Sequence, residues 1–348
     1  MKRRNFFKNA AGIAMVTQLT PNGEAGTEKP IESFKFDRKQ WEVMGNGFQA
    51  MPDRKKTVSY DVVVVGAGMA GICAAVASAR NGAKTVLIND RPVLGGNASS
   101  EIRVTVNGVA HLKPKGLPER ETGIIEEILI ENRARNPQES YPVWDHVLYD
   151  FVTRESNLTL MLNTQAMDAV MKGDRITAAR CWQLTTETEF MVQGQVFIDC
   201  SGDGLLAAKA GAIFRTGREA ASEFDEKYAP KEADGWQMGA SILMQAKDMG
   251  RPMPYTPPAF VIKYDAEKAH DRAINQFIDG FWWVELGSEF DIIDEQEDNR
   301  HKLMGYLHGV WDYVKNSGEF PESENFALDW VGALPGRRES RRFIGDFI

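Results

Sequence analysis

The hydrophobic pattern of the chain becomes regular at about residue 60, where strand and helix signals begin to alternate. Residues 61–65 are a β-branched run of the kind that fills a central parallel strand. A stretch rich in small residues follows and ends at Gly82, which predicts a helix packed closely on that strand. A second apolar run, 85–88, predicts a second strand. Residues 60–90 therefore predict a strand–helix–strand unit.

The pattern continues with two amphipathic helices and a group of short strands. Residues 121–157 carry two helical patterns that we interpret as scaffold. Their apolar positions are Ile124, Ile125, Ile128 and Leu129 on one helix, and Val147, Leu148, Phe151 and Val152 on the other. Further strands are predicted at 158–162, 166–171, 176–184 and 196–200.

Three glycines between the first strand and its helix have the G-x-G-x-x-G spacing of a dinucleotide-binding turn. Gly66 permits the tight turn, Gly68 lets the backbone approach a pyrophosphate, and Gly71 lets the helix lie close to the strand. Asp90 follows nineteen residues after Gly71, where a carboxylate is expected to bind ribose hydroxyls. These features predict a dinucleotide cofactor, but the glycines alone do not distinguish FAD from NAD.

Two later segments favour FAD. Gly95 and Gly96 follow the acidic strand end, and the strand at 196–200 leads into Ser201-Gly202-Asp203-Gly204. This pairing resembles the FAD-containing oxidoreductases of the glutathione-reductase-like superfamily. In that superfamily a β-meander commonly interrupts the nucleotide domain, and the strands between 158 and 184 resemble it. The resemblance implies an α/β fold: a Rossmann-like FAD-binding domain with a central parallel sheet and a β-meander.

Five segments narrow the resemblance to one family. They are LGGNASSEIRV (94–104), RETGIIEEI (120–128), WQLTTETEF (182–190), FIDCSGDGLLA (197–207) and GRRESRRFIGD (336–346). Together they resemble the bacterial FAD-dependent oxidoreductases, whose broader kin include the flavin-binding part of heterodisulfide reductase. The family implies no single substrate. Its members continue beyond GRRESRR, so we expect this chain to end inside the fold; a truncated, catalytically silent flavin-binding product is therefore the alternative to an active enzyme.

The cofactor-binding residues follow from these motifs and from the resemblance. They are Gly66, Ala67, Gly68, Met69, Ala70, Gly71, Asp90, Arg91, Gly95, Gly96, Asn97, Ala166, Ser201, Gly202 and Asp203. For catalysis, we expect Glu101 to act as a base if desolvation raises its pKa, and arginines to hold a substrate carboxylate. The catalytic residues are thus Glu101, Arg103, Arg337 and Arg341. A structural ion pair between Glu101 and Arg103 is the alternative.

The chain also divides into regions of different composition. Residues 1–25 resemble a twin-arginine export signal, with Arg3 and Arg4 before a short, weakly apolar stretch, and 26–58 are a linker. We expect an FAD-binding domain at 59–215, an inserted α+β substrate lobe rich in Trp and Pro at 216–330, and a return to the FAD domain at 331–348. The signal predicts a periplasmic protein, tethered to the membrane only if the signal stays uncleaved.

Composition excludes several other classes of protein. A net charge of −8 gives no reason to expect a nucleic-acid partner. The three cysteines, Cys73, Cys181 and Cys200, lack C-x-x-C spacing, and His301 and His308 lack a third ligand, so no metal site is predicted. The expected partners are a small organic substrate and an electron acceptor whose identity the sequence does not indicate. A cytoplasmic NAD(P)-dependent enzyme is the remaining alternative.

Overall fold

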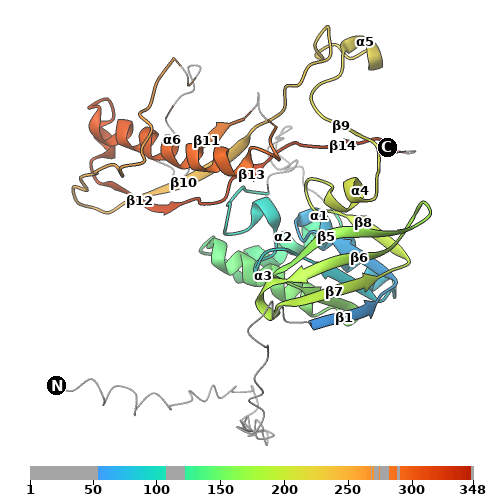
Figure 1. The fold of residues 1–348 in the computed structure, drawn as a ribbon. Helices are drawn as coiled ribbons and strands as arrows, with labels where there is room; N and C mark the ends of the chain where they lie inside the picture. The colour runs from blue at the N-terminus through green and yellow to red at the C-terminus, as the bar shows by residue number, and fades with distance from the viewer. Residues whose placement is uncertain are drawn as a thin grey trace, which may run out of the picture. The chain divides into compact units, whose positions relative to one another are not determined.

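A parallel sheet of four strands carries the predicted cofactor motifs. A computed structural model describes residues 54–106, 122–267, 269, 274, 282–287 and 291–345. The sheet has the order β4-β3-β2-β8 and includes the strand labelled β8 in Figure 1. Its strands are β2 (Val62–Val65), β3 (Thr85–Ile88), β4 (Leu158–Met161) and β8 (Val196–Asp199). Each lies within one residue of a strand predicted from the sequence, which confirms the central parallel sheet. The assignment of 158–162 to the β-meander is wrong, because this strand pairs parallel with β3 as β4.

Both faces of this sheet are covered, which explains why its strands are apolar without alternation. Successive side chains of a strand point to opposite faces. Val64 of β2 packs with the helices α1 (Met69–Arg80), α2 (Ile124–Arg135) and α3 (Tyr141–Thr153). Val63 and Val65 pack instead against the second sheet. The two helices predicted between 121 and 157 are therefore present, and Leu148, Phe151 and Val152 of α3 are buried as expected.

The second sheet contains a β-meander, as predicted, but one strand further along: two of its strands match the predictions at 166–171 and 176–184, and the third, at 188–193, was not predicted. Its strands are β5 (Thr164–Lys172), β6 (Arg175–Gln183) and β7 (Thr188–Gln193), paired antiparallel in sequence order. A further strand, β1 (Arg54–Ser59), pairs parallel with β7. The prediction of a linker over 26–58 is therefore wrong at its C-terminal end, because residues 54–58 belong to β1. Their side chains are mostly exposed, so the sequence carried no hydrophobic signal for this edge strand.

Among the described residues after 239, the main elements are an antiparallel sheet and the helix α6 (Gln296–Asn316). The sheet has the order β11-β10-β12, made of β11 (Trp282–Leu286), β10 (Ala240–Asp248) and β12 (Phe326–Val331), and β13 (Gly336–Arg337) pairs with the start of β10. Helix α6 contributes Leu303, Leu307 and Trp311 to their shared core.

Short elements connect these two parts. Helix α4 (Leu205–Lys209) follows the Ser201–Gly204 turn, α5 (Ala221–Phe224) lies further along the chain, and β9 (Phe214–Arg215) pairs antiparallel with β14 (Arg342–Phe343). All described residues belong to one compact unit, 52–348, so the division at 215 and 330 remains a prediction. The proposed signal and most of the linker lie outside the described residues. Among the helices that the structure describes, none is long and apolar enough to cross a membrane.

Candidate cofactor site

Three sequence motifs meet at the carboxyl edge of the parallel sheet. The turn after β2 contacts the turn after β8, since the Cys200 N–H donates to the Val65 carbonyl at 2.7 Å. It also contacts the Gly95-Gly96 segment, since the Gly95 N–H donates to the Ala67 carbonyl at 2.8 Å. The chain runs from β2 to β3 and β4 on one side, while β8 adds on the other. This edge is a topological switch point, where open α/β sheets bind their ligands.

The three glycines of the first motif are needed for different reasons. Gly66 has φ 95°, and a Cβ built there would lie 2.2 Å from the Cys200 carbonyl oxygen. A Cβ on Gly71 would lie 1.8 Å from the Gly66 carbonyl oxygen, so α1 begins against the turn itself. Gly68 differs, because it has φ −66° and a Cβ there would meet no described atom within 4 Å. Two glycines are thus required by the fold, and the third borders open space.

That open space lies at the N-terminus of α1. The helix is twelve residues long, begins with Met69 and Ala70, and has no acidic residue in its first turn. No described side chain caps it. Its first N–H groups and the positive end of its dipole are therefore available to an anion such as a pyrophosphate. Gly96 packs directly on this turn, since a Cβ on it would lie 3.0 Å from the Gly68 Cα.

The end of β3 supplies a free carboxylate and a buried amide. Asp90 is exposed, as a ribose ligand requires. Asn89, which the sequence did not single out, is 7% exposed and bonds to the first glycine turn. Arg91 pairs with Glu101 at 3.5 Å, and its carbonyl accepts from the Asn89 side chain.

The turn after β8 is held by its own side chains. The Asp199 carboxylate accepts the Ser201 and Ala207 N–H groups at 3.0 and 2.8 Å. The Ser201 hydroxyl accepts the Leu205 N–H at 2.8 Å, at the start of α4. Asp199 is not among the predicted cofactor-binding residues, although it lies in the segment 197–207, and it ties the turn to helix α4.

Residues 336–342, which we call the C-terminal strap, contact two of the three cofactor motifs, the segment after Gly96 and the turn after β8. The Asn97 side-chain amide donates to the Arg337 carbonyl at 2.9 Å, and the Ser340 hydroxyl donates to Asp203 at 2.8 Å. Arg337 forms an ion pair with Asp203, and Arg341 donates to the Asp203 carbonyl at 3.0 Å. The predicted arginines of the strap therefore lie beside the cofactor motifs, but they are engaged by Asp203.

Glu101 and Arg103 lie in different surroundings. Burial raises the pKa of the half-buried Glu101 carboxyl, against the opposing effect of Arg91. Arg103 instead stacks on Trp330, with its guanidinium 4.1 Å from the ring centroid, and donates to Gln245 at 2.8 Å. Burial lowers the pKa of Arg103. The alternative prediction, an ion pair between Glu101 and Arg103, is wrong, because Glu101 pairs with Arg91 instead.

The remaining sequence candidates have structural surroundings. Ala166 is 5% exposed within β5 and lies opposite Cys181 of β6. The three cysteines are free, and burial raises the pKa of Cys181 to about 12. His308 hydrogen-bonds the Tyr255 hydroxyl at 2.8 Å.

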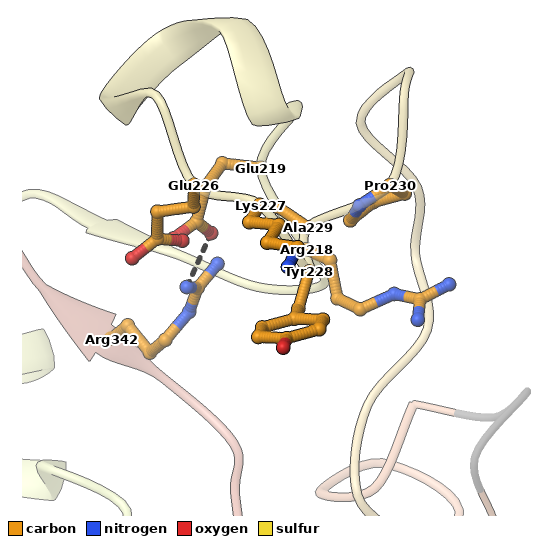
Figure 2. A pocket seen from close by; sticks show the side chains of 8 residues that line it. All are labelled: Arg218, Glu219, Glu226, Lys227, Tyr228, Ala229, Pro230 and Arg342. Carbon is orange, nitrogen blue, oxygen red and sulfur yellow. Dashed lines mark hydrogen bonds and ion pairs between the residues drawn. The ribbon is translucent and has the colours of Figure 1, made fainter.

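A separate open pocket of about 480 Å³ lies in the segment after β9 (Figure 2). Two arginines that line it form ion pairs, Arg342 with Glu219 and Arg218 with Asp234. None of its lining residues comes from the three cofactor motifs, so it is not where those motifs would hold a dinucleotide.

Fold and site together define a dinucleotide-binding protein of the Rossmann type. The family model described as FAD dependent oxidoreductase matches residues 61–348. The chain therefore belongs to this FAD-dependent oxidoreductase family, and its cofactor is FAD.

Comparisons with individual proteins give partial matches. The chain is 32% identical over 142 residues to the tRNA uridine 5-carboxymethylaminomethyl modification enzyme MnmG of Chlorobium chlorochromatii (strain CaD3), a match covering 35% of this chain and 22% of that protein. The chain thus spans about a fifth of this relative.

Two solved structures resemble most of the chain. A geranylgeranyl bacteriochlorophyll reductase-like protein of Thermoplasma acidophilum is 14% identical, with a TM-score of 0.43, covering 80% of this chain and 66% of that one. The anhydrotetracycline hydroxylase OxyS of Streptomyces rimosus is 13% identical, with a TM-score of 0.42, covering 79% and 52%.

The residues at the sheet edge fit FAD. The uncapped start of α1 suits a pyrophosphate, and Gly68 leaves room for the backbone to be approached. The exposed Asp90 suits ribose hydroxyls.

Proposed function

We propose that this protein transfers a hydride between a small organic substrate and the N5 atom of FAD. The observation that carries the proposal is the meeting of three motifs at the switch point, where Gly66 contacts Cys200 and Ala67 contacts Gly95. FAD supplies the redox chemistry when it is bound. The protein must hold it, orient the substrate and move a proton.

The described residues divide these tasks. The start of α1 binds the pyrophosphate and Asp90 binds the ribose. Among the four residues proposed for catalysis, Glu101 has the surroundings of a proton carrier, because burial raises the pKa of its carboxyl and its ion pair with Arg91 is long at 3.5 Å. Arg337 and Arg341 act through Asp203 and position the C-terminal strap against the site.

The visible spectrum of the purified chain tests the cofactor and the reaction. Oxidised flavin bands at one FAD per chain, bleached anaerobically by an organic donor, would support the proposal. Glu101→Gln should then slow reduction without releasing FAD. Colourless protein that also fails to take up added FAD would contradict it, and yellow protein that no donor reduces would instead support a silent flavin-binding product.

We further propose that residues 1–25 direct export by the twin-arginine route, so that the enzyme works in the periplasm with an electron acceptor there. The paired Arg3-Arg4 before an apolar stretch supports this, and so does the need to insert FAD before transport. Residues 1–58 fused to a folded fluorescent reporter should carry it to the periplasm. The same fusion with Arg3→Lys and Arg4→Lys should stay in the cytoplasm; equal export of both fusions would overturn this proposal.

A further inference from the structure

Asn89 occupies the point where the first strand–helix turn meets the segment leading to Gly95. It follows β3 directly and is 7% exposed. Its backbone is fixed to the neighbouring strands: the Asn89 N–H donates to the Met161 carbonyl at 2.9 Å, and its carbonyl accepts from Thr164 at 2.8 Å. The side chain therefore projects from a rigid anchor.

The Asn89 side chain uses both ends of its amide. Its oxygen accepts the Ala67 N–H at 3.2 Å, between Gly66 and Gly68. Its nitrogen donates to the Arg91 carbonyl at 3.2 Å and to the Val93 carbonyl at 2.8 Å. One side chain thus joins the glycine turn to the segment that ends at the Gly95-Gly96 turn.

An amide is required by this pattern. A carboxylate only accepts hydrogen bonds, so it could keep the Ala67 contact but not the other two. It would also face the Arg91 and Val93 carbonyl oxygens at hydrogen-bond distance in a buried place. The neighbouring Asp90 is exposed and leaves a carboxylate for the ribose.

We propose that Asn89 is a positioning residue of the FAD site. It sets the spacing between the two glycine turns and engages the Ala67 N–H, so that the pyrophosphate is met by the start of α1 alone. Asp90 remains the residue that contacts the cofactor. The inference rests on FAD binding at this edge, as in the proposed function.

The test compares Asn89→Asp with Asp90→Asn, two neighbouring changes of one charge in opposite directions. Each apo-protein is checked for folding by circular dichroism and then titrated with FAD by fluorescence. At pH 8, Asn89→Asp should raise the FAD dissociation constant at least tenfold although the apo-protein is folded. Asp90→Asn should also raise the FAD dissociation constant, but without a change in the melting temperature of the apo-protein.

The pH dependence of FAD binding by Asn89→Asp distinguishes a positioning role from a merely structural one. At pH 5 the carboxyl introduced by Asn89→Asp can take up a proton and donate to the Val93 carbonyl, so the ratio of its dissociation constant to that of the wild type should fall towards one. Both proteins contain the ionisable side chains Asp90, Arg91 and Glu101 beside this loop, and the ratio removes the effect that these groups have in common.

Three outcomes decide the question. A ratio within twofold of one at both pH values, with wild-type protein binding FAD, would overturn the positioning role and leave the proposed function intact. Wild-type protein that binds no FAD would overturn both. If Asn89→Asp does not fold, Asn89→Ser takes its place; it should weaken FAD binding at least threefold, and unchanged binding would again overturn the role.

Discussion

Gly68→Ala should separate cofactor binding from folding. Gly68 has φ −66° and ψ 179°, a conformation that alanine adopts without strain. A Cβ there meets no described atom within 4 Å, so the fold itself does not exclude it. The methyl group would instead occupy the space that borders the start of α1, where we expect the pyrophosphate.

The expected effect on stability is small because two terms oppose each other. Replacing glycine by alanine stabilises a compatible position by about 0.4–1 kcal/mol through the unfolded chain. Alanine is a poorer N-cap than glycine, which costs an amount of similar size. The melting temperature of the apo-protein should therefore change by no more than about 4 °C. The FAD dissociation constant should rise at least tenfold, which corresponds to about 1.4 kcal/mol.

Two other glycines provide controls. Gly71→Ala places a Cβ 1.8 Å from the Gly66 carbonyl oxygen and should lower both stability and FAD binding. Gly82 lies after α1 with φ 90° and open space around it, so Gly82→Ala should cost about 1–2 kcal/mol of stability and leave FAD binding unchanged. Thermal unfolding of the apo-proteins and fluorescence titration with FAD measure the two quantities. Wild-type FAD affinity in Gly68→Ala would refute the placement of the pyrophosphate.

Three further changes test other contacts. Asp203→Asn should cost about 1–2 kcal/mol in urea unfolding by weakening the partly buried contacts with Arg337 and Ser340; an unchanged midpoint would show that they contribute nothing. Arg103→Lys should cost about 1 kcal/mol, because lysine cannot keep both the cation–π contact with Trp330 and the hydrogen bond to Gln245, and unchanged stability would show that these contacts contribute nothing. Burial raises the pKa of the Cys181 thiol from 9.0 to about 12, so the contribution of this thiol to stability should be complete below pH 9 and lost as the pH rises towards 12. Cys181→Ala should therefore make the free energy of unfolding less dependent on pH between about 9 and 12. The same pH dependence in the variant and the wild type would contradict this prediction.

The parallel sheet and its three helices could be predicted because their signals are local. The β-branched run of β2, the small residues of α1 and the apolar stripe of α3 each lie within a dozen or so residues. β1 has no such signal, because it is an exposed edge strand whose order depends on β7, more than 130 residues away.

The glycines of the cofactor site could be predicted from the sequence, but the side chains that hydrogen-bond to the turns around them could not. Asn89 and Asp199 act through hydrogen bonds to particular backbone groups, and no spacing rule marks them. Asp203 is separated from Ser340 by 137 residues, so the sequence could suggest that both approach the cofactor but not that they contact each other.

The pairing of β2 with β8 also sets the order of events during synthesis. Val62 pairs with Val196, and 134 residues separate them along the chain. At roughly 5–20 residues per second, the ribosome needs about 7–27 s to complete the second strand after the first. During that interval one edge of an entirely apolar strand has no neighbour, which is the condition that favours misassociation between nascent chains. The parallel sheet is therefore complete only after the whole β-meander has been synthesised, although its first two strands lie within residues 62–88.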